Sequence, residues 1–250
     1  MPAKLAILAH DWMETLIGLI YPNVCQCCEK ERAGRAQGYV GASCREDVRL
    51  MRPPMCERCG LAFKGEINTI FECSNCQNVA LHFTYARSAA AARGVLLDVI
   101  HRYKYSRALW FEPFLAELLV NAAAPAIRGS AWNMIVPVPL HPARQREREF
   151  NQAENLGRHL SRATGLVVNA RAIIRTEATP SQTRLTREER AKNVRNAFAL
   201  RPRANVRGAR IVLVDDVMTT GATTNACARV LRKAGAEEVC VWTVARGLVQ

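Results

Sequence analysis

The sequence predicts an α/β protein whose parallel sheet follows a small cysteine-rich module. Short apolar runs alternate with amphipathic stretches across residues 81–250, which is the pattern of strands and helices in a parallel sheet. Eight of the ten cysteines lie between Cys25 and Cys76, which sets that part of the chain apart. We therefore expect three segments: an amphipathic helix over residues 1–22, a cysteine module over 23–80 and the α/β domain over 81–250.

The N-terminal segment is predicted to form a short amphipathic helix rather than a membrane span. Its apolar residues recur at helical spacing, at Leu5, Leu8, Trp12, Leu16 and Leu19. His10, Asp11 and Glu14 interrupt the run, whereas a membrane span needs about 20 mostly apolar residues. Because no small-residue cleavage site follows, we expect a cytoplasmic protein whose thiols are reduced or bound to metal.

The cysteine module carries three CxxC pairs, at 25–28, 56–59 and 73–76. A CxxC pair lets both thiolates reach one tetrahedral metal ion from a tight turn. So small and loop-rich a segment lacks the apolar residues to fold unaided, which favours structural zinc over free thiols. Four residues form a complete ligand set, namely Cys56, Cys59, Cys73 and Cys76.

A second zinc site is predicted from Cys25, Cys28 and Cys44, with Asp47 as the fourth ligand. Asp47 stands where a fourth CxxC pair would end, and a carboxylate oxygen can bind zinc. Cys27 as the ligand, or an empty site, is the alternative, so we expect one or two zinc ions. Iron–sulfur ligation is a weaker alternative. Cys227 and Cys240 fall on apolar faces and are expected to pack in the core.

The α/β domain is predicted to contain the following elements in order. Helices are expected over 95–103, 110–123, 151–165 and 222–234, and strands over 133–139, 211–217 and 238–244. Asn151 can cap the third of these helices and Gly165 can end it. Residues 186–189 form a capping box that opens a further helix. The last strand, helix and strand make one βαβ unit of ordinary size.

The segment from 211 to 224 indicates the chemistry. Its apolar strand ends in Asp215 and Asp216, and ligands bind at the carboxyl edge of such a sheet. Neighbouring strand residues point to opposite faces, so both can reach a ligand only if the chain turns soon after them, and we expect that turn over 218–221. Backbone N–H groups and hydroxyls then form an anion cradle at a helix N-terminus, over Thr219, Thr220, Gly221, Ala222 and Thr223. Two carboxylates beside a phosphate cradle suit a ribose 5-phosphate.

This string resembles the motif of type I phosphoribosyltransferases that binds phosphoribosyl pyrophosphate (PRPP). Further segments resemble the ComF family, in which such a domain follows a zinc-ribbon-like module. They are the pair Lys104-Tyr105, the stretch 136–141, Arg148 with Phe150 to Gln152, Gln182 with Leu185, Arg190 with Asn193 and Phe198, and the stretch 214–223. The resemblance runs from Cys25 to Arg246 and implies a parallel sheet of the type I phosphoribosyltransferase kind.

The resemblance also implies roles for individual residues. Asp215 and Asp216 would act as the catalytic pair and hold the ribose hydroxyls, while residues 219–223 would bind the 5-phosphate. Pyrophosphate would face Arg144, Arg146 and Arg148, with Mg²⁺ bridging it to the ribose. A mobile flap would contain Gln182, Arg190 and Asn193. One departure is Glu149, where the family usually has Gly, and a carboxylate there is expected to lie near the same anion.

Two functions follow as hypotheses. The first is phosphoribosyl transfer from PRPP to an unidentified acceptor, a pentosyl glycosyltransferase activity that belongs to nucleoside metabolism. Such transfer needs positioning and charge stabilisation rather than a nucleophilic side chain. The resemblance to the ComF family links the protein to DNA uptake and natural transformation. Walker A and GxGxxG motifs are absent from the sequence, which argues against a P-loop NTPase or a dinucleotide-dependent dehydrogenase.

The alternative is a non-catalytic competence accessory protein that binds single-stranded DNA and uses the fold as a scaffold. The chain has a net charge of +13, and the whole excess lies in residues 81–250. Nine cations between 184 and 210 could follow a phosphate backbone, or form a solvated face and a PRPP flap: Arg184, Arg187, Arg190, Lys192, Arg195, Arg201, Arg203, Arg207 and Arg210. Competence or DNA-processing proteins would then be partners.

Overall fold

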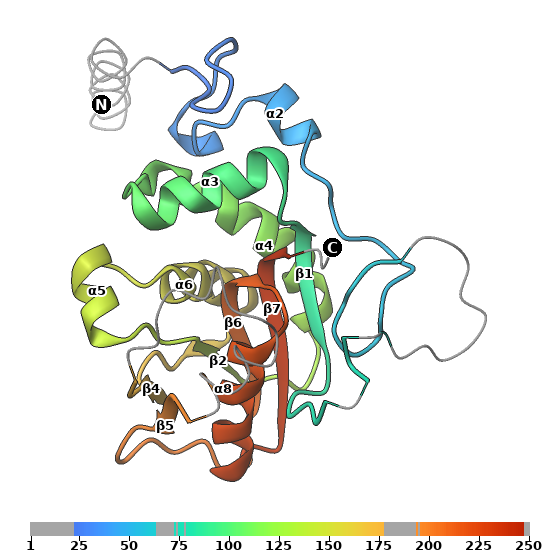
Figure 1. Cartoon of the computed structure of the whole chain (residues 1–250), viewed down its shortest axis with the longest axis vertical. Coiled ribbons are helices and arrows are strands. Elements are labelled where there is room, and N and C mark those ends of the chain that lie inside the picture. The colour runs from blue at the N-terminus through green and yellow to red at the C-terminus, as the bar shows by residue number, and fades with distance from the viewer. Residues whose placement is uncertain are drawn as a thin grey trace, which may run out of the picture.

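Five parallel strands form the central sheet in the order β1-β7-β6-β2-β3 (Figure 1). Their bounds are β1 Ala86–Ala91, β2 Met134–Pro137, β3 Val167–Val168, β6 Arg210–Met218 and β7 Glu238–Arg246. The short strands β4 Ile173–Arg175 and β5 Phe198–Leu200 form a separate antiparallel pair. This computed structural model describes residues 23–63, 73, 75–77, 79–177, 194 and 196–247. The helix predicted over 1–22 and the capping box at 186–189 lie outside these residues.

Helices cover both faces of the sheet (Figure 1). The longer ones are α3 Gly94–Tyr105, α4 Glu112–Ile127, α6 Gln152–Thr164 and α8 Ala222–Lys233; the shorter ones are η1 Arg35–Gln37, α2 Ala42–Glu46, η2 Leu109–Phe111 and α5 Pro142–Arg148. Helices α3, α4 and α6 share one apolar core with one face of the sheet, and α8 shares a second core with the other face. The prediction of a parallel α/β sheet is confirmed. In the described part of the chain, no helix is long and apolar enough to cross a membrane.

Local sequence signals explain the central elements. Residues 211–214 of β6 are fully buried, as expected for a parallel strand with helices on both faces. Helix α6 begins where Asn151 Oδ1 accepts a 3.0 Å hydrogen bond from the Ala153 N–H, and it ends at Gly165 in the left-handed region. Both caps match the prediction. Cys227 and Cys240 have no exposed surface, which confirms their packing role.

Strand β6 runs from Arg210 to Met218, one residue longer at each end than the predicted strand over 211–217. The turn predicted over 218–221 therefore begins one residue later, at Thr219. Strand β7 pairs with β6 as far as Met218, whereas β2 pairs with it only as far as Val214. Beyond Val214 one edge of β6 is open, so the extended chain can still present both carboxylates.

The two cysteine clusters pack against opposite faces of the sheet. Cys25 and Cys44 belong to the core that contains α3 and α4, while the cysteines at 56, 59, 73 and 76 belong to the core that contains α8. The first cluster is held on α4 by an ion pair of 2.8 Å between Arg45 and Glu117. The second is held on β1, where the Ala86 N–H donates to the Arg58 carbonyl oxygen at 2.7 Å. The cysteine module therefore straddles the β1 edge of the sheet.

Candidate anion-binding site and metal centres

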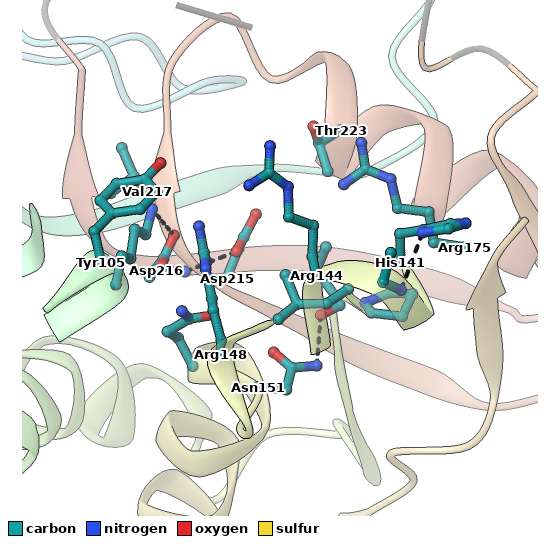
Figure 2. Close-up of a pocket in the computed structure, with 16 residues that line it drawn as sticks. Tyr105, His141, Arg144, Arg148, Asn151, Arg175, Asp215, Asp216, Val217 and Thr223 are labelled. Atoms are coloured by element: carbon teal, nitrogen blue, oxygen red, sulfur yellow. Dashed lines mark hydrogen bonds and ion pairs between the residues drawn. The ribbon is translucent and has the colours of Figure 1, made fainter. Parts of the chain in front are cut away.

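A crevice of about 480 Å³ opens beyond the carboxyl ends of β2 and β6 (Figure 2). These two strands are neighbours, but the chain leaves β2 towards β3 and β6 towards β7, so they flank a topological switch point. The charged and amide side chains that line the crevice are Lys104, Arg144, Arg148, Asn151, Gln152, Arg175, Asp215 and Asp216. Four cations thus surround two carboxylates, which gives the crevice a net attraction for anions.

Lys104 and the two aspartates lie next to one another in the lining of the crevice. Lys104 Nζ lies 2.8 Å from Asp216 Oδ1, and both side chains are largely buried. The Asp216 N–H donates to Asp215 Oδ1 at 2.9 Å, which fixes the first carboxylate beside the second. Burial, followed by the neighbouring charge of Asp216, raises the pKa of Asp215 above its ordinary value, although Lys104 opposes the shift. A cationic or hydroxyl-bearing ligand beside Asp215 would therefore offset the cost of its buried charge.

The phosphate loop, defined here as residues 219–223, links β6 to α8. Gly221 has a φ of 80° and forms the N-cap of α8, so backbone N–H groups of the first turn are left for a ligand. A Cβ at Gly221 would lie 2.7 Å from Met218 Cε, the far end of a flexible side chain, so the φ of 80° is the stronger requirement for glycine here. Thr223 also lines the main crevice. The structure thus brings the predicted loop residues next to Asp215.

The arginine-rich segment contributes two of its three predicted residues. Arg144 and Arg148 line the crevice, whereas Arg146 is exposed and is not among the lining residues. The Arg148 guanidinium lies 4.9 Å from the centre of the Tyr105 ring, which holds its charge in position over an aromatic face (Figure 2). The predicted flap residues Gln182, Arg190 and Asn193 lie outside the described residues.

Glu149 does not line the crevice. It has a φ of 69° at the C-terminus of α5, and its carboxylate pairs with Arg107 at 3.0 Å. The expectation that this carboxylate lies near the bound anion is therefore not met, because the helix end directs it elsewhere. The left-handed backbone conformation also gives a physical reason for glycine at this position.

Four charged or amide residues that line the crevice were not among the predicted site residues, namely Lys104, Asn151, Gln152 and Arg175. Lys104 belongs to the Lys104-Tyr105 pair that carries part of the family resemblance, but its charge partner could not be inferred without the fold. Arg175 comes from β4 and packs over the Phe198 ring, 5.5 Å from its centre, and no local pattern marks it. Gln152 has 2% of its surface exposed, and its Nε2 atom is buried without a hydrogen-bond partner among the described residues. Buried amides are almost always paired, so this atom is an exception in the crevice wall.

The second cysteine cluster has the geometry of a tetrahedral metal centre. The Sγ atoms are 3.8 Å apart between Cys56 and Cys76, 3.3 Å between Cys59 and Cys73, and 3.6 Å between Cys73 and Cys76. A tetrahedral zinc ion with Zn–S bonds of about 2.3 Å places its sulfur atoms about 3.8 Å apart. All four cysteines are free and buried, so they fit zinc as predicted.

The first cluster brings together Cys25, Cys28, Cys44 and Glu31, and not Asp47. Asp47 is an exposed residue at the C-cap of α2 and is not among the residues that gather at this cluster. The prediction of Asp47 as the fourth ligand therefore does not match the described geometry, and neither does the Cys27 alternative. Glu31 reaches the cluster instead, with Oε1 3.7 Å from Cys28 Sγ.

Hydrogen bonds prepare the first cluster for a cation. Burial raises the pKa of the Cys25 thiol, but backbone N–H groups, led by that of Gly41, outweigh burial and lower the pKa below its ordinary value. The Ser43 N–H bonds to Glu31 and lowers the pKa of that carboxyl. Both groups are therefore biased towards their anionic forms, which are the forms that bind zinc.

Two family models match the chain. Residues 16–78 match a double zinc ribbon domain, and residues 153–249 match a phosphoribosyl transferase domain. Among solved structures, a purine phosphoribosyltransferase from Pyrococcus horikoshii is 17% identical and has a TM-score of 0.35, covering 54% of this chain and 87% of that protein. Adenine phosphoribosyltransferase from Saccharomyces cerevisiae is 14% identical with a TM-score of 0.36, over 58% of this chain and 72% of that one. Because both TM-scores are below 0.5, the fold assignment rests on the family models and the strand order instead.

Relatives of known name cover nearly the whole chain. Competence protein F of Haemophilus influenzae is 32% identical over 215 residues, which are 84% of this chain and 92% of the relative. The DNA utilization protein YhgH of Escherichia coli K12 is 32% identical over 235 residues, which are 92% of this chain and 100% of the relative. The predicted double-zinc-ribbon and phosphoribosyltransferase-type parts are thus both present, and the chain belongs to the ComF family.

Proposed function

We propose that the crevice binds PRPP. The observation that carries this proposal is the meeting of three features in one crevice: the Asp215–Asp216 pair, the phosphate loop and the cations from α3, α5 and β4. A carboxylate pair accepts hydrogen bonds from vicinal ribose hydroxyls. The loop amides suit the 5-phosphate, and the arginines suit a pyrophosphate group.

The residues have distinct roles in the proposed complex. Asp215 and Asp216 hold the 2- and 3-hydroxyls, and Lys104 pairs with Asp216. Arg144 and Arg148 face the pyrophosphate, where a bound Mg²⁺ ion would neutralise part of its charge. Closure of the flap residues Gln182, Arg190 and Asn193 over the ligand is a further part of this proposal.

Phosphoribosyl transfer is the reaction that such a site would serve. The bond between ribose C1 and the pyrophosphate oxygen breaks, pyrophosphate leaves, and an acceptor bonds to C1. Positive charge develops on the ribose ring, so the carboxylate pair and a rigid ligand position would supply the stabilisation. The acceptor is unidentified, and the described crevice contains no residue set that selects a nucleobase or an amine.

A panel of anions tests the binding proposal. The zinc-loaded full chain is heated with Mg²⁺ and, separately, PRPP, ribose 5-phosphate, pyrophosphate or sulfate. A ligand that binds only the native state raises Tm with its concentration. PRPP is expected to give the largest shift because it alone reaches the aspartates, the loop and the arginines together. An equal shift of Tm with sulfate would mean that the site binds anions in general and does not recognise PRPP.

A second function, association with single-stranded DNA in competence, is favoured by charge. The relatives are named for competence and DNA utilization. The net charge is +13, and Arg201, Arg203 and Arg207 are exposed in the described part of the basic segment. Arg210 is instead engaged by Glu237 and Glu238. Competence or DNA-processing proteins would be the partners, and the cytoplasm the expected location.

Salt dependence tests the DNA proposal. When binding to single-stranded DNA rests on phosphate contacts, the logarithm of the association constant falls linearly with the logarithm of salt concentration, with a slope of about −0.7 per phosphate contact. A steep slope that flattens when Arg201, Arg203 and Arg207 are replaced by Gln supports an electrostatic site there. Weak binding that does not change with salt contradicts it.

A further inference from the structure

Arg246 is a buried cation at the end of β7 that touches both a zinc site and the phosphate loop. None of its surface is exposed, and it is the largest of the fully buried side chains. Its Nη1 atom donates to the carbonyl oxygen of Met218 at 2.9 Å and also to that of Thr219. Its Nη2 atom lies 3.7 Å from Cys59 Sγ. One guanidinium thus spans from a predicted zinc ligand to the start of the loop.

The burial of this charge needs a counter-charge. A buried guanidinium is almost always paired, because an isolated buried ion is strongly destabilising. Among the described residues, no carboxylate forms an ion pair with Arg246, and its Nε atom has no partner. Four cysteine thiolates around one Zn²⁺ ion carry a net charge of −2. The zinc-loaded cluster of residues 56, 59, 73 and 76 is therefore the anion that compensates Arg246.

The other end of the contact shapes the phosphate loop. The Met218 carbonyl oxygen accepts a second hydrogen bond, of 2.8 Å, from the Gly247 N–H. A Cβ at Gly247 would lie 2.8 Å from Thr219 Cγ2 and 3.3 Å from Thr219 Cα, so the loop backbone packs closely on the end of β7. Arg246 and Gly247 together hold the first loop residues in place.

We propose that Arg246 couples the zinc site to the phosphate loop, so that the loop keeps its anion-binding conformation only when the metal is bound. The coupling itself needs no ligand. Its consequence, that zinc loading sets PRPP affinity, rests on the proposed function. An emptied cluster no longer holds Cys59 as an acceptor for the guanidinium. Arg246 then loses its counter-charge and releases the Met218 and Thr219 carbonyl groups. Coupling of this kind is reciprocal, so a disturbed loop also weakens zinc retention.

Amide hydrogen exchange of residues 219–224, measured without PRPP, tests the coupling. In the wild-type full chain, loss of zinc from this cluster, by chelation or by Cys76→Ser, is expected to speed exchange at least tenfold. In the described part of the chain, Arg246 bonds to Cys59 of this cluster and not to Cys76, so this variant removes a metal ligand and leaves that bond's partners in place. Arg246→Met is expected to exchange quickly with or without zinc. The matched control is Cys28→Ser, which disturbs only the first cluster and should leave loop exchange unchanged.

Zinc release gives a second readout that does not depend on how well Arg246→Met folds. With a colorimetric chelator, Arg246→Lys and Gly247→Ala are expected to release zinc from this cluster several times faster than the wild type. Loop exchange that does not respond to zinc, or release rates equal to the wild type, would overturn the coupling. If loop exchange responds to zinc but the protein binds no PRPP, the coupling is supported and the proposed function is contradicted.

Discussion

Lys104 Nζ lies 2.8 Å from Asp216 Oδ1, which ties the end of α3 to the carboxyl end of β6 inside the crevice. Lys104 is 19% exposed and Asp216 10%, so water screens this pair poorly. The lysine compensates one of two adjacent carboxylates and leaves the other for a ligand.

Lys104→Met is expected to destabilise the protein by about 3 kcal/mol, because it leaves the buried Asp216 carboxylate without its partner. Denaturant unfolding at neutral pH measures this. The double variant Lys104→Met/Asp216→Asn removes both charges and should recover most of the lost stability. A double variant as unstable as the single one would show that Lys104 acts through packing alone.

Asp215→Asn should stabilise the protein in a pH-dependent way. Since burial and Asp216 raise the pKa of Asp215 in the folded state, ionising it opposes folding at every pH above its unfolded pKa, about 3.9. The Tm advantage of the variant is therefore expected to be small at pH 4, to grow as pH rises, and to level off above the raised pKa. An advantage that shrinks as pH rises would contradict this sign.

Gly221→Ala is expected to weaken PRPP binding by about tenfold or more. Alanine strains the positive φ of 80° and so shifts the backbone of the phosphate loop. Gly165→Ala is the matched control, since Gly165 has a similar φ of 78° but lies at the end of α6, outside the phosphate loop. Both variants should lose about 1 kcal/mol of stability, and calorimetry should find weaker binding in the first only.

Glu149→Gly should change PRPP affinity by less than about twofold, because the Glu149 carboxylate pairs with Arg107 and not with the crevice. Arg148→Ala, at the adjacent position, should lower affinity by about tenfold or more. A large gain in affinity on Glu149→Gly would mean that this carboxylate does act on the bound anion.

Metal content distinguishes Glu31 from Asp47 as the fourth ligand of the first cluster. Elemental analysis of purified protein should find less zinc in Glu31→Ala than in the wild type, whereas Asp47→Ala should match the wild type. Glu31 lies with the cysteines and Asp47 is exposed, which gives the expected direction. Loss of zinc from Asp47→Ala alone would restore the ligand set expected from spacing.

Helix ends, buried strands and tight turns could be predicted from the sequence, because each depends on residues that are close together in the chain. The helix between Asn151 and Gly165 is bounded by caps that act over a few residues, so its ends could be placed from the sequence. The buried run before Asp215 and the glycine of the phosphate loop are likewise readable, because strand burial and a positive φ leave a direct mark on residue choice.

Tertiary contacts explain what the sequence could not predict. Arg175 enters the crevice from a short separate strand, and the partner of Lys104 depends on where the end of α3 lies against the end of β6. The length of β6 depends on how far its neighbour β7 pairs with it. Spacing favoured Asp47 as a ligand, whereas the path of the chain before α2 brings Glu31 to the cluster.

Calorimetric titration of the zinc-loaded full chain with PRPP and Mg²⁺ tests the central claim most directly. The wild type is compared with Asp215→Ala/Asp216→Ala, after circular dichroism shows that both are folded. Saturable one-site binding in the wild type that is lost in the double variant is the predicted result. A folded, zinc-loaded wild type that takes up no PRPP, or a double variant that binds it equally well, would contradict the assignment of this crevice.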